Sequence, residues 1–353
     1  MADLERITSQ PEAYERVQDL AEKGFSEIPS AYIRPLEERP SISESTALRD
    51  IPVIDLSSET SPDLSAKVGL ACREWGFFQV LNHGVPLELL ERMRHIGAQF
   101  FAMSLEDKLV YACKDTGSAP EGYGSRMLVK EEQVLDWRDY IDHHTLPITR
   151  RNPDRWPSHP PEYRKTVEEY SDETNKLARR LLRLISESLG LEPSVIEDAI
   201  GDPSQNITIN YYPPCPQPHL TLGLQAHSDM GAITLLLQDD VAGLQVYKDH
   251  EWFTVQPLPD AFVVNLGDML QIVSNDKYKS VEHRAVVNRD RPRMSVATFY
   301  DPSKSRYISP ASALLENNHP ALFRSVLFGE HVSAWYYTGP DGKKNIESLV
   351  IEG

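Results

Sequence analysis

Two side chains that bind metals well lie two residues apart, directly before an apolar run. The stretch is "QAHSDMGAITLLLQ", residues 225–238, in which His227 and Asp229 precede a sequence typical of a buried strand. Residues two apart in an extended chain point to the same side, so we expect both side chains to project together from the start of that strand. His283, in "YKSVEHRAVVN", lies in a second strand-like run that can pair beside the first. These three side chains are predicted to bind one metal ion.

Two histidines and one carboxylate are the set typical of non-haem Fe(II) oxygenases, where they leave positions open on one side of the metal. The pattern alone is a moderate signal, because a chain with eleven histidines contains HxD pairs by chance. The run "RPRMSVATFY" strengthens it by placing Arg293 and Ser295 on one face of a strand. A guanidinium and a hydroxyl on one face can bind a carboxylate through charge-assisted hydrogen bonds. The sequence therefore predicts a metal site beside a carboxylate site.

Three other histidines are weaker candidates. His83, in "LNHGVP", lies in a tight turn and is expected to be structural. His143 and His144 are adjacent, so on a strand they point to opposite faces and cannot both enter one site. One of them could still line a pocket.

Further motifs are spread along the chain. They are "IPVIDL", "WGFFQVLNHGVP", "EGYGSR", "DWRDY", "NYYPPCPQP", "HSDMGAITLLLQD", "GLQV", "NLGDMLQIVSN", "YKSVEHR" and "RMSVATFYDPS". As a set they are highly specific, and over nearly its whole length the chain resembles the plant 2-oxoglutarate- and Fe(II)-dependent dioxygenases.

The resemblance implies a role for each matching residue. It implies iron ligands at His227, Asp229 and His283, a clasp for the distal carboxylate of 2-oxoglutarate at Arg293 and Ser295, and contacts near that cosubstrate at Asn210 and Tyr212. The implied cofactors are Fe(II), 2-oxoglutarate and O2, with ascorbate as a reductant in vitro. Oxidative decarboxylation of 2-oxoglutarate to succinate and CO2 would accompany hydroxylation or desaturation of a substrate.

Strand alternation gives an expectation about that substrate. If Arg293 and Ser295 point inward, Ala297, Phe299 and Asp301 do so too, and an aromatic substrate could stack on Phe299. Ordinary core packing of Phe299 is an equal alternative.

The resemblance to the anthocyanidin synthase and flavonol synthase branch favours a flavonoid, such as a flavanone or dihydroflavonol. Phe299, Asp301 and Tyr140 match its pocket positions, although that branch usually has glutamate where this chain has Asp301. Thr208 stands where the branch commonly has lysine, and Asp142 where it often has an aromatic residue.

Other functions remain open as interpretations of the same sequence. A jasmonate-oxidising relative would be expected to carry arginine at the Thr208 position. Feruloyl-CoA ortho-hydroxylases are similar in "AYIRPLEER" and "DGKK", but coenzyme A would favour a basic rim that this acidic chain does not suggest. A zinc hydrolase could use the same three ligands without needing the Arg293 and Ser295 pair. A non-catalytic jelly-roll binding protein could keep the fold and lose the metal.

Helical and strand patterns separate along the chain. Helical spacing is expected at 11–24, 64–75, 87–101 and, longest, 161–189. Short β-type runs follow residue 205 without intervening helices. This indicates an α+β fold with a β-rich core, a distorted double-stranded β-helix or jelly roll with a helical N-terminal part and a long supporting helix. We expect one catalytic unit, 1–353, with a mainly helical part at 1–204, the jelly roll at 205–310 and a helical extension at 311–353.

Composition excludes several partners. The chain has 53 acidic and 36 basic residues and a net charge of -17, which disfavours nucleic acid and anionic lipid surfaces. Cys72, Cys113 and Cys215 show no CxxC spacing, and neither a secretory signal nor a membrane span is expected. The expected protein is a cytoplasmic monomer whose partner is a small aromatic molecule.

Overall fold

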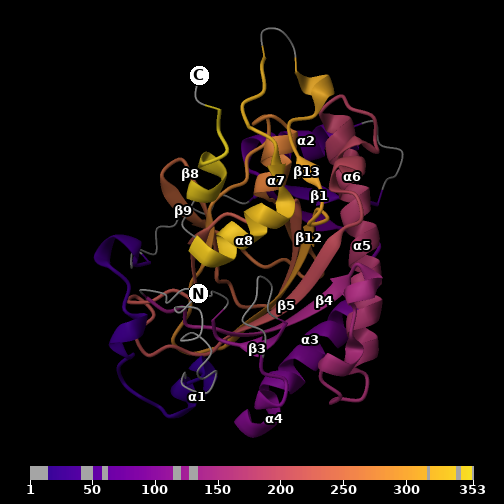
Figure 1. The fold of residues 1–353 in the computed structure, drawn as a ribbon. Helices are drawn as coiled ribbons and strands as arrows, with labels where there is room; N and C mark the ends of the chain where they lie inside the picture. The colour runs from indigo at the N-terminus through magenta and orange to yellow at the C-terminus, as the bar shows by residue number, and fades with distance from the viewer. Residues whose placement is uncertain are drawn as a thin grey trace, which may run out of the picture.

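Two β-sheets face each other, and helices cover the outer face of the larger one (Figure 1). The computed structural model describes residues 15–40, 51–57, 63–113, 121–126, 134–315, 319–338 and 343–351. The first expected helix appears as α1 (Val17–Glu22), and residues 11–14 of that expectation lie outside the described residues.

The larger sheet has eight strands in the order β1-β2-β10-β7-β12-β5-β4-β3. Their bounds are β1 Val53–Asp55, β2 Phe77–Leu81, β3 Gly122–Gly124, β4 Asp139–Leu146, β5 Ser204–Tyr212, β7 Ile233–Gln238, β10 Phe262–Leu266 and β12 Arg293–Asp301. The smaller sheet, in the order β6-β11-β8-β9, contains β6 Leu224–His227, β8 Leu244–Lys248, β9 Glu251–Thr254 and β11 His283–Ala285. A short pair joins β13 Tyr307–Ile308 to β14 Val326–Leu327. All pairings are antiparallel except that of β1 with β2.

The helices lie mostly outside this framework. They are α2 Leu64–Glu74, α3 Leu87–Phe101, α4 Leu105–Leu109, α5 Tyr163–Ser188, α6 Val195–Ile200, α7 Asp268–Val273, α8 Phe328–Thr338 and α9 Lys344–Glu347. The long helix α5 runs along one side of the larger sheet with α3 beside it (Figure 1). Its apolar face, which includes the buried Leu177 and Leu181, packs into the main core. This is the long supporting helix that the spacing of apolar residues over 161–189 predicts.

Alternation along β12 separates the core from the site. Val296 and Tyr300 point into the core beneath α5, and the Tyr300 hydroxyl donates to Asn175 Oδ1 of that helix at 2.9 Å. Arg293, Ser295 and Phe299 point the other way, toward the smaller sheet. The observed architecture confirms the predicted α+β jelly roll with a β-rich core.

The prediction that His227 and Asp229 begin one strand is wrong. His227 is the last residue of β6, and Asp229 lies in the connection between β6 and β7. The backbone of this connection pairs with the start of α7 in place of a strand: Asp268 N donates to the Asp229 carbonyl at 2.7 Å, and Met269 N to the Gly231 carbonyl at 3.0 Å. The carboxylate is therefore presented by a turn.

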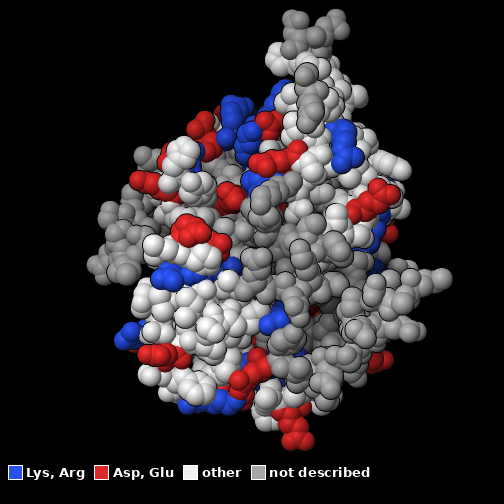
Figure 2. Space-filling view, turned by 60° about the vertical axis from the view of Figure 1, so that its left-hand side comes forward, with Lys and Arg blue, Asp and Glu red and all other residues white. Residues whose placement is uncertain are grey.

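The surface shows no single dominant sign of charge on the face in Figure 2. Lysine and arginine side chains are interspersed there with aspartate and glutamate. Across the described ranges of the chain, no helix has both the length and the apolar character needed to cross a membrane.

Candidate metal and cosubstrate site

Three buried side chains bring their ligand atoms together between the two sheets. His227 and His283 are direct partners across the antiparallel pair β6 and β11, with ring centroids 4.3 Å apart. Asp229 Oδ1 lies 3.5 Å from His227 Nε2 and 3.7 Å from His283 Nε2. The three candidate ligand atoms lie within 4.8 Å of one another, close enough to share one ion.

Hydrogen bonds orient each of these groups. His227 Nδ1 meets the Gln225 carbonyl at 2.8 Å, and His283 Nδ1 meets the Val281 carbonyl at 3.2 Å. A carbonyl oxygen can only accept, so each Nδ1 carries the proton and each Nε2 turns its lone pair toward the space that it shares with Asp229 Oδ1, where a metal ion would bind. Neutral imidazoles held in this way are the form that binds metals.

The Asp229 carboxyl is held from the opposite side. Its Oδ2 accepts hydrogen bonds from Thr234 Oγ1 at 2.5 Å and Asn265 Nδ2 at 2.7 Å. Burial opposes the charge of this carboxyl, but the nearby His283 and His227 imidazoles and its hydrogen bonds bring its pKa below the usual range. Burial is the main cause that lowers the pKa of His283 to about 4, which keeps this imidazole neutral. The fixed negative charge and the nitrogen donors fit Fe(II).

A cavity opens beside the three ligands, between the two sheets. Arg293 and Ser295 line it together with Asn210 and Tyr212. Arg293 Nε donates to the Val241 carbonyl at 3.2 Å, and an Nη atom donates to Gln238 Oε1 at 2.9 Å. Both acceptors are neutral, so the guanidinium charge remains available for an anion.

Two neighbours shape the position of Arg293. Its guanidinium carbon lies 5.1 Å from the centre of the Tyr212 ring. A Cβ at position 243 would lie 2.5 Å from Arg293 Cδ, so Gly243 gives this side chain the room it needs. The guanidinium of Arg293 and the hydroxyl of Ser295 thus line one cavity, as the expected binding of a carboxylate there requires.

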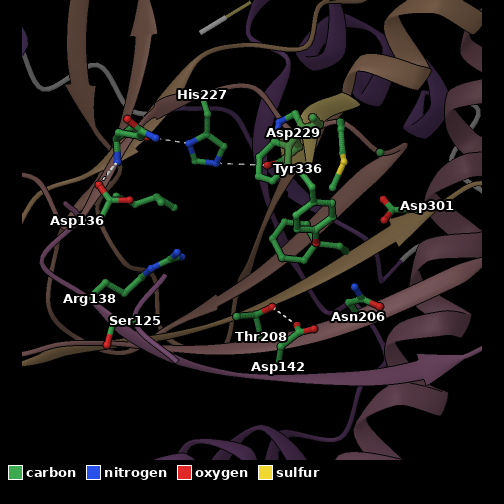
Figure 3. Close-up of a pocket in the computed structure, with 16 residues that line it drawn as sticks. Ser125, Asp136, Arg138, Asp142, Asn206, Thr208, His227, Asp229, Asp301 and Tyr336 are labelled. Carbon is green, nitrogen blue, oxygen red and sulfur yellow. Dashed lines mark hydrogen bonds and ion pairs between the residues drawn. The ribbon is translucent and has the colours of Figure 1, made fainter. Parts of the chain in front are cut away.

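A second cavity lies on the other side of His227 and Asp229 (Figure 3). Its aromatic wall is formed by Phe299 of β12 and by Trp335 and Tyr336 of α8. The helical extension at the C-terminus therefore contributes directly to this pocket.

One end of this second cavity is acidic. Asp142, Asp301, Thr208 and Asn206 line it, and Thr208 Oγ1 donates to Asp142 Oδ1 at 2.5 Å. Burial raises the pKa of Asp142 and of Asp301 to about 7 each. Thr208, Asp142, Phe299 and Asp301 thus all face one pocket, as their expected role in substrate binding requires.

Tyr140 does not line either cavity. Its hydroxyl donates to the Arg126 carbonyl at 2.7 Å, and its ring lies against Gly124, its register partner on β3. A glycine there leaves the space that the ring occupies, which turns Tyr140 away from the pocket. It stands behind Arg138, whose guanidinium carbon lies 5.4 Å from the ring centre.

The other histidines have structural partners. His83 bonds to the Asp260 carbonyl at 2.9 Å and accepts from Val85 N at 3.1 Å. His143 is buried between the Ile207 carbonyl and the Tyr163 hydroxyl, at 2.8 and 3.0 Å. His144 Nε2 lies 3.5 Å from Asp142 Oδ2, so it supports the pocket from behind without lining it.

Among the residues of the pocket wall that sequence reasoning missed are Arg138, Asn206, Trp335 and Tyr336. Arg138 lies in the quoted motif "DWRDY", and only its basic side chain in an otherwise acidic chain could have singled it out. Asn206 lies two residues before Thr208 on β5, so strand alternation could have found it. No local pattern shows that Trp335 and Tyr336 fold back over the sheets.

Comparison with known proteins places the chain in a family. The family model described as 2OG-Fe(II) oxygenase superfamily matches residues 203–302, and the one described as the N-terminal region of non-haem dioxygenase in morphine synthesis matches residues 51–161. The chain is 43% identical over 351 residues to jasmonate-induced oxygenase 4 of Arabidopsis thaliana, covering 98% of this chain and 99% of the relative. It is 40% identical over 337 residues to flavanone 3-dioxygenase 2 of Oryza sativa subsp. japonica, covering 95% and 98%.

A solved structure agrees with the sequence relatives. The crystal structure of JOX2 in complex with 2OG, Fe and JA superposes with a TM-score of 0.90 at 42% identity, covering 97% of this chain and 99% of that chain. The chain therefore belongs to the plant 2-oxoglutarate- and Fe(II)-dependent dioxygenases, enzymes that use Fe(II), 2-oxoglutarate and O2.

Proposed function

We propose that this dioxygenase hydroxylates or desaturates a small aromatic plant metabolite, with His227, Asp229 and His283 as its iron ligands. The observation that carries the proposal is the convergence of three ligand atoms within 4.8 Å at the junction of two cavities. One cavity has the charge that 2-oxoglutarate needs, and the other has the aromatic wall that a flat substrate needs.

Bound Fe(II), with 2-oxoglutarate and O2, supplies the oxidation of a substrate C–H bond together with decarboxylation of the cosubstrate. The protein positions the cosubstrate and the metal ligands. Arg293 and Ser295 hold the distal carboxylate of 2-oxoglutarate, and Asn265 and Thr234 keep Asp229 turned toward the metal. The burial of the ligands keeps bulk water away from the reacting centre.

Flavonoids, such as a flavanone or a dihydroflavonol, are the substrate class of first choice. Phe299, Trp335 and Tyr336 offer aromatic faces on which a planar ring system can stack. Asp142 and Asp301 offer acceptors for ring hydroxyl groups. The relationship to a rice flavanone 3-dioxygenase adds support.

A jasmonate-type acid is the second candidate. Its support is the relationship to jasmonate-induced oxygenases and to a structure that contains JA. At Thr208, where an arginine would be expected for such a carboxylate, this chain instead pairs a neutral hydroxyl with Asp142. A carboxylate would have to bind elsewhere in the pocket.

We further propose that residues 1–353 act as one catalytic unit. Support comes from the larger pocket, whose lining runs from Ser125 to Tyr336 in the sequence. Neither the 1–204 part nor the 205–310 part would carry all of these residues alone.

Turnover measurements test the proposal. Anaerobically purified protein is given Fe(II), ascorbate and 2-oxoglutarate and then mixed with air and a panel of flavanones, dihydroflavonols, jasmonic acid and feruloyl-CoA. We expect succinate release together with a product heavier by one oxygen or lighter by two hydrogens. Asp229→Ala is the matched negative control. Turnover of the coenzyme A ester alone would contradict the choice of a flavonoid substrate, and activity with zinc but not with iron would favour a hydrolase.

A further inference from the structure

Arg138 lies where the two cavities meet. The residues that line both cavities are Arg138, Thr208, Leu224, His227, Asp229 and Phe299. Arg138 is only 5% exposed, and its guanidinium points into the pocket below His227 in Figure 3. A positive charge therefore faces the space beside the predicted metal.

The hydrogen-bond and ring contacts of Arg138 are with neutral groups. An Nη atom donates to Asn210 Oδ1 at 3.0 Å, and the Tyr140 ring lies beneath the guanidinium at 5.4 Å. Its Nε has no hydrogen-bond partner among the described residues. Asp136, which lines the same cavity, interacts with the charge of Arg138, but its direct ion pair is with Arg34 at 2.6 Å, and it also accepts from Gln225 N at 2.9 Å. A buried guanidinium without its own carboxylate is costly unless an anion completes it.

The charges of the cosubstrate are met by other groups. Two positive charges on Fe(II) balance the Asp229 carboxylate and the C1 carboxylate of 2-oxoglutarate. The distal carboxylate has Arg293, whose own hydrogen bonds go to the neutral oxygens of Val241 and Gln238. By this count Arg138 remains for a third anion, which must come from the substrate.

The rest of the substrate pocket would not hold an anion. Its other end carries the carboxyl groups of Asp142 and Asp301, which would repel a carboxylate whenever they are ionised. Arg150 and Lys304 lie near enough to interact with Asp301, and Arg150 also with Asp142, so the acids there already have compensating cations. The pocket therefore has the Arg138 guanidinium at one end, where Asp136 is already paired with Arg34, and the carboxyl groups of Asp142 and Asp301 at the other.

We propose that Arg138 binds an anionic oxygen of the primary substrate, supplied by a carboxylate or by an ionised phenol. This assignment rests on the proposed oxidation of a small molecule in the same pocket. The Nε edge of a guanidinium suits a carboxylate, which can accept two parallel hydrogen bonds, and it can also hold a single phenolate oxygen. The end of the substrate that bears hydroxyl groups would then point toward Asp142 and Asp301.

Binding without turnover tests the proposal separately from the reaction. Wild-type protein is loaded with Fe(II) and 2-oxoglutarate under nitrogen, and ligands are titrated by tryptophan fluorescence, since Trp335 lines the pocket. The carboxylate arm pairs jasmonic, indole-3-acetic and ferulic acids with their methyl esters. The phenol arm titrates a flavanone at pH values below and above the ionisation of its most acidic hydroxyl.

We expect at least one acid to bind roughly 10- to 100-fold more tightly than its ester, or the flavanone to bind more tightly once ionised, by the usual strength of a charged hydrogen bond. In Arg138→Gln this preference should disappear while affinity for the neutral form stays within about 2-fold. Arg138→Lys should keep part of the preference, because it retains the charge and loses the planar fork. Arg291→Gln, on an exposed arginine that pairs with Asp240, is the matched control and should behave as wild type.

The opposite pattern overturns the proposal. If Arg138→Gln weakens binding of 2-oxoglutarate while leaving the acid-to-ester ratio unchanged, Arg138 serves the cosubstrate. If no acid in the panel binds more tightly than its ester and no phenol gains affinity on ionisation, the Arg138 end of the pocket does not select anions. Failure of the proposed oxidation would appear differently, as anion-selective binding without any product in air.

Discussion

Asn265 on β10 and Thr234 on β7 are register partners in the larger sheet, and both donate to the same oxygen of Asp229. They occupy Oδ2 and thereby leave Oδ1 to face the two imidazoles. A rigid pair of neighbouring strands thus orients a carboxylate that is itself carried by a turn.

Removing either hydrogen-bond donor to Asp229 should weaken metal binding. We expect Asn265→Ala and Thr234→Val each to weaken Fe(II) binding roughly 10- to 100-fold, the usual effect of losing a partner of a metal ligand. Anaerobic Fe(II) titration followed by metal analysis measures this. Thr234→Ser, which keeps the hydroxyl, should stay near wild type, and equal iron affinity in Thr234→Val would show that this hydrogen bond does not orient Asp229.

Arg293 should set the affinity for 2-oxoglutarate. Truncation in Arg293→Ala leaves a buried carboxylate of the cosubstrate without its partner, at a cost of about 2 to 5 kcal/mol in binding. The measurement is the dissociation constant of 2-oxoglutarate for the anaerobic Fe(II) protein. Arg291→Ala removes an exposed arginine two residues away, 59% exposed in its pair with Asp240, and is the control. An unchanged constant in Arg293→Ala would remove Arg293 from the cosubstrate site.

The sequence predicts this site well because its elements are regular. The expected helix at 87–101 agrees with α3, and that at 161–189 differs from α5 by two residues at the start and one at the end. Alternation along β12 correctly places Phe299 and Asp301 on the side of Arg293. In each of these elements, the spacing of apolar residues in the sequence matches the face of the helix or strand that packs against the core.

Features that depend on long-range packing escape such reasoning. Asp229 is presented by a turn because its backbone pairs with α7, about forty residues later in the chain, and no local period encodes that contact. Trp335 and Tyr336 reach the pocket only because α8 folds back over the sheets (Figure 1). Tyr140 turns away because Gly124 on a neighbouring strand leaves space for its ring.

Asp142 should make stability depend on pH. Burial raises its pKa to about 7, whereas a solvated aspartate titrates near about 3.9. The folded state therefore retains a proton that the unfolded chain releases, and rising pH between these values increasingly favours unfolding. We expect Asp142→Asn, whose amide oxygen can still accept from Thr208, to raise Tm more at pH 8 than at pH 5. Exposed Asp290→Asn is the control, and a gain that is equal at both pH values would contradict the assignment.

Lys343 fastens the C-terminal segment behind the site. Its Nζ lies 3.7 Å from Asp268 Oδ1 and donates to Gln271 Oε1 at 2.9 Å and to the Ser280 carbonyl. Lys343→Met would remove the cation beside buried Asp268 and one of the two donors to Gln271 Oε1, which also accepts from Ser280 N, so we expect the free energy of unfolding to fall by about 1 to 3 kcal/mol. Denaturant unfolding of the metal-free protein measures the change. Lys279→Met, on an exposed pair with Asp276, should have little effect, and equal losses in both variants would argue against a special role for Lys343.

The pairing of His227 with His283 across β6 and β11 has a consequence for folding. Side chains alternate between the faces of a strand, so a slip of one residue would send one imidazole to the opposite side. Iron can then bind tightly only to molecules whose two strands are aligned correctly. The amount of iron taken up per chain should therefore count the fraction of a preparation whose smaller sheet has formed in the right register.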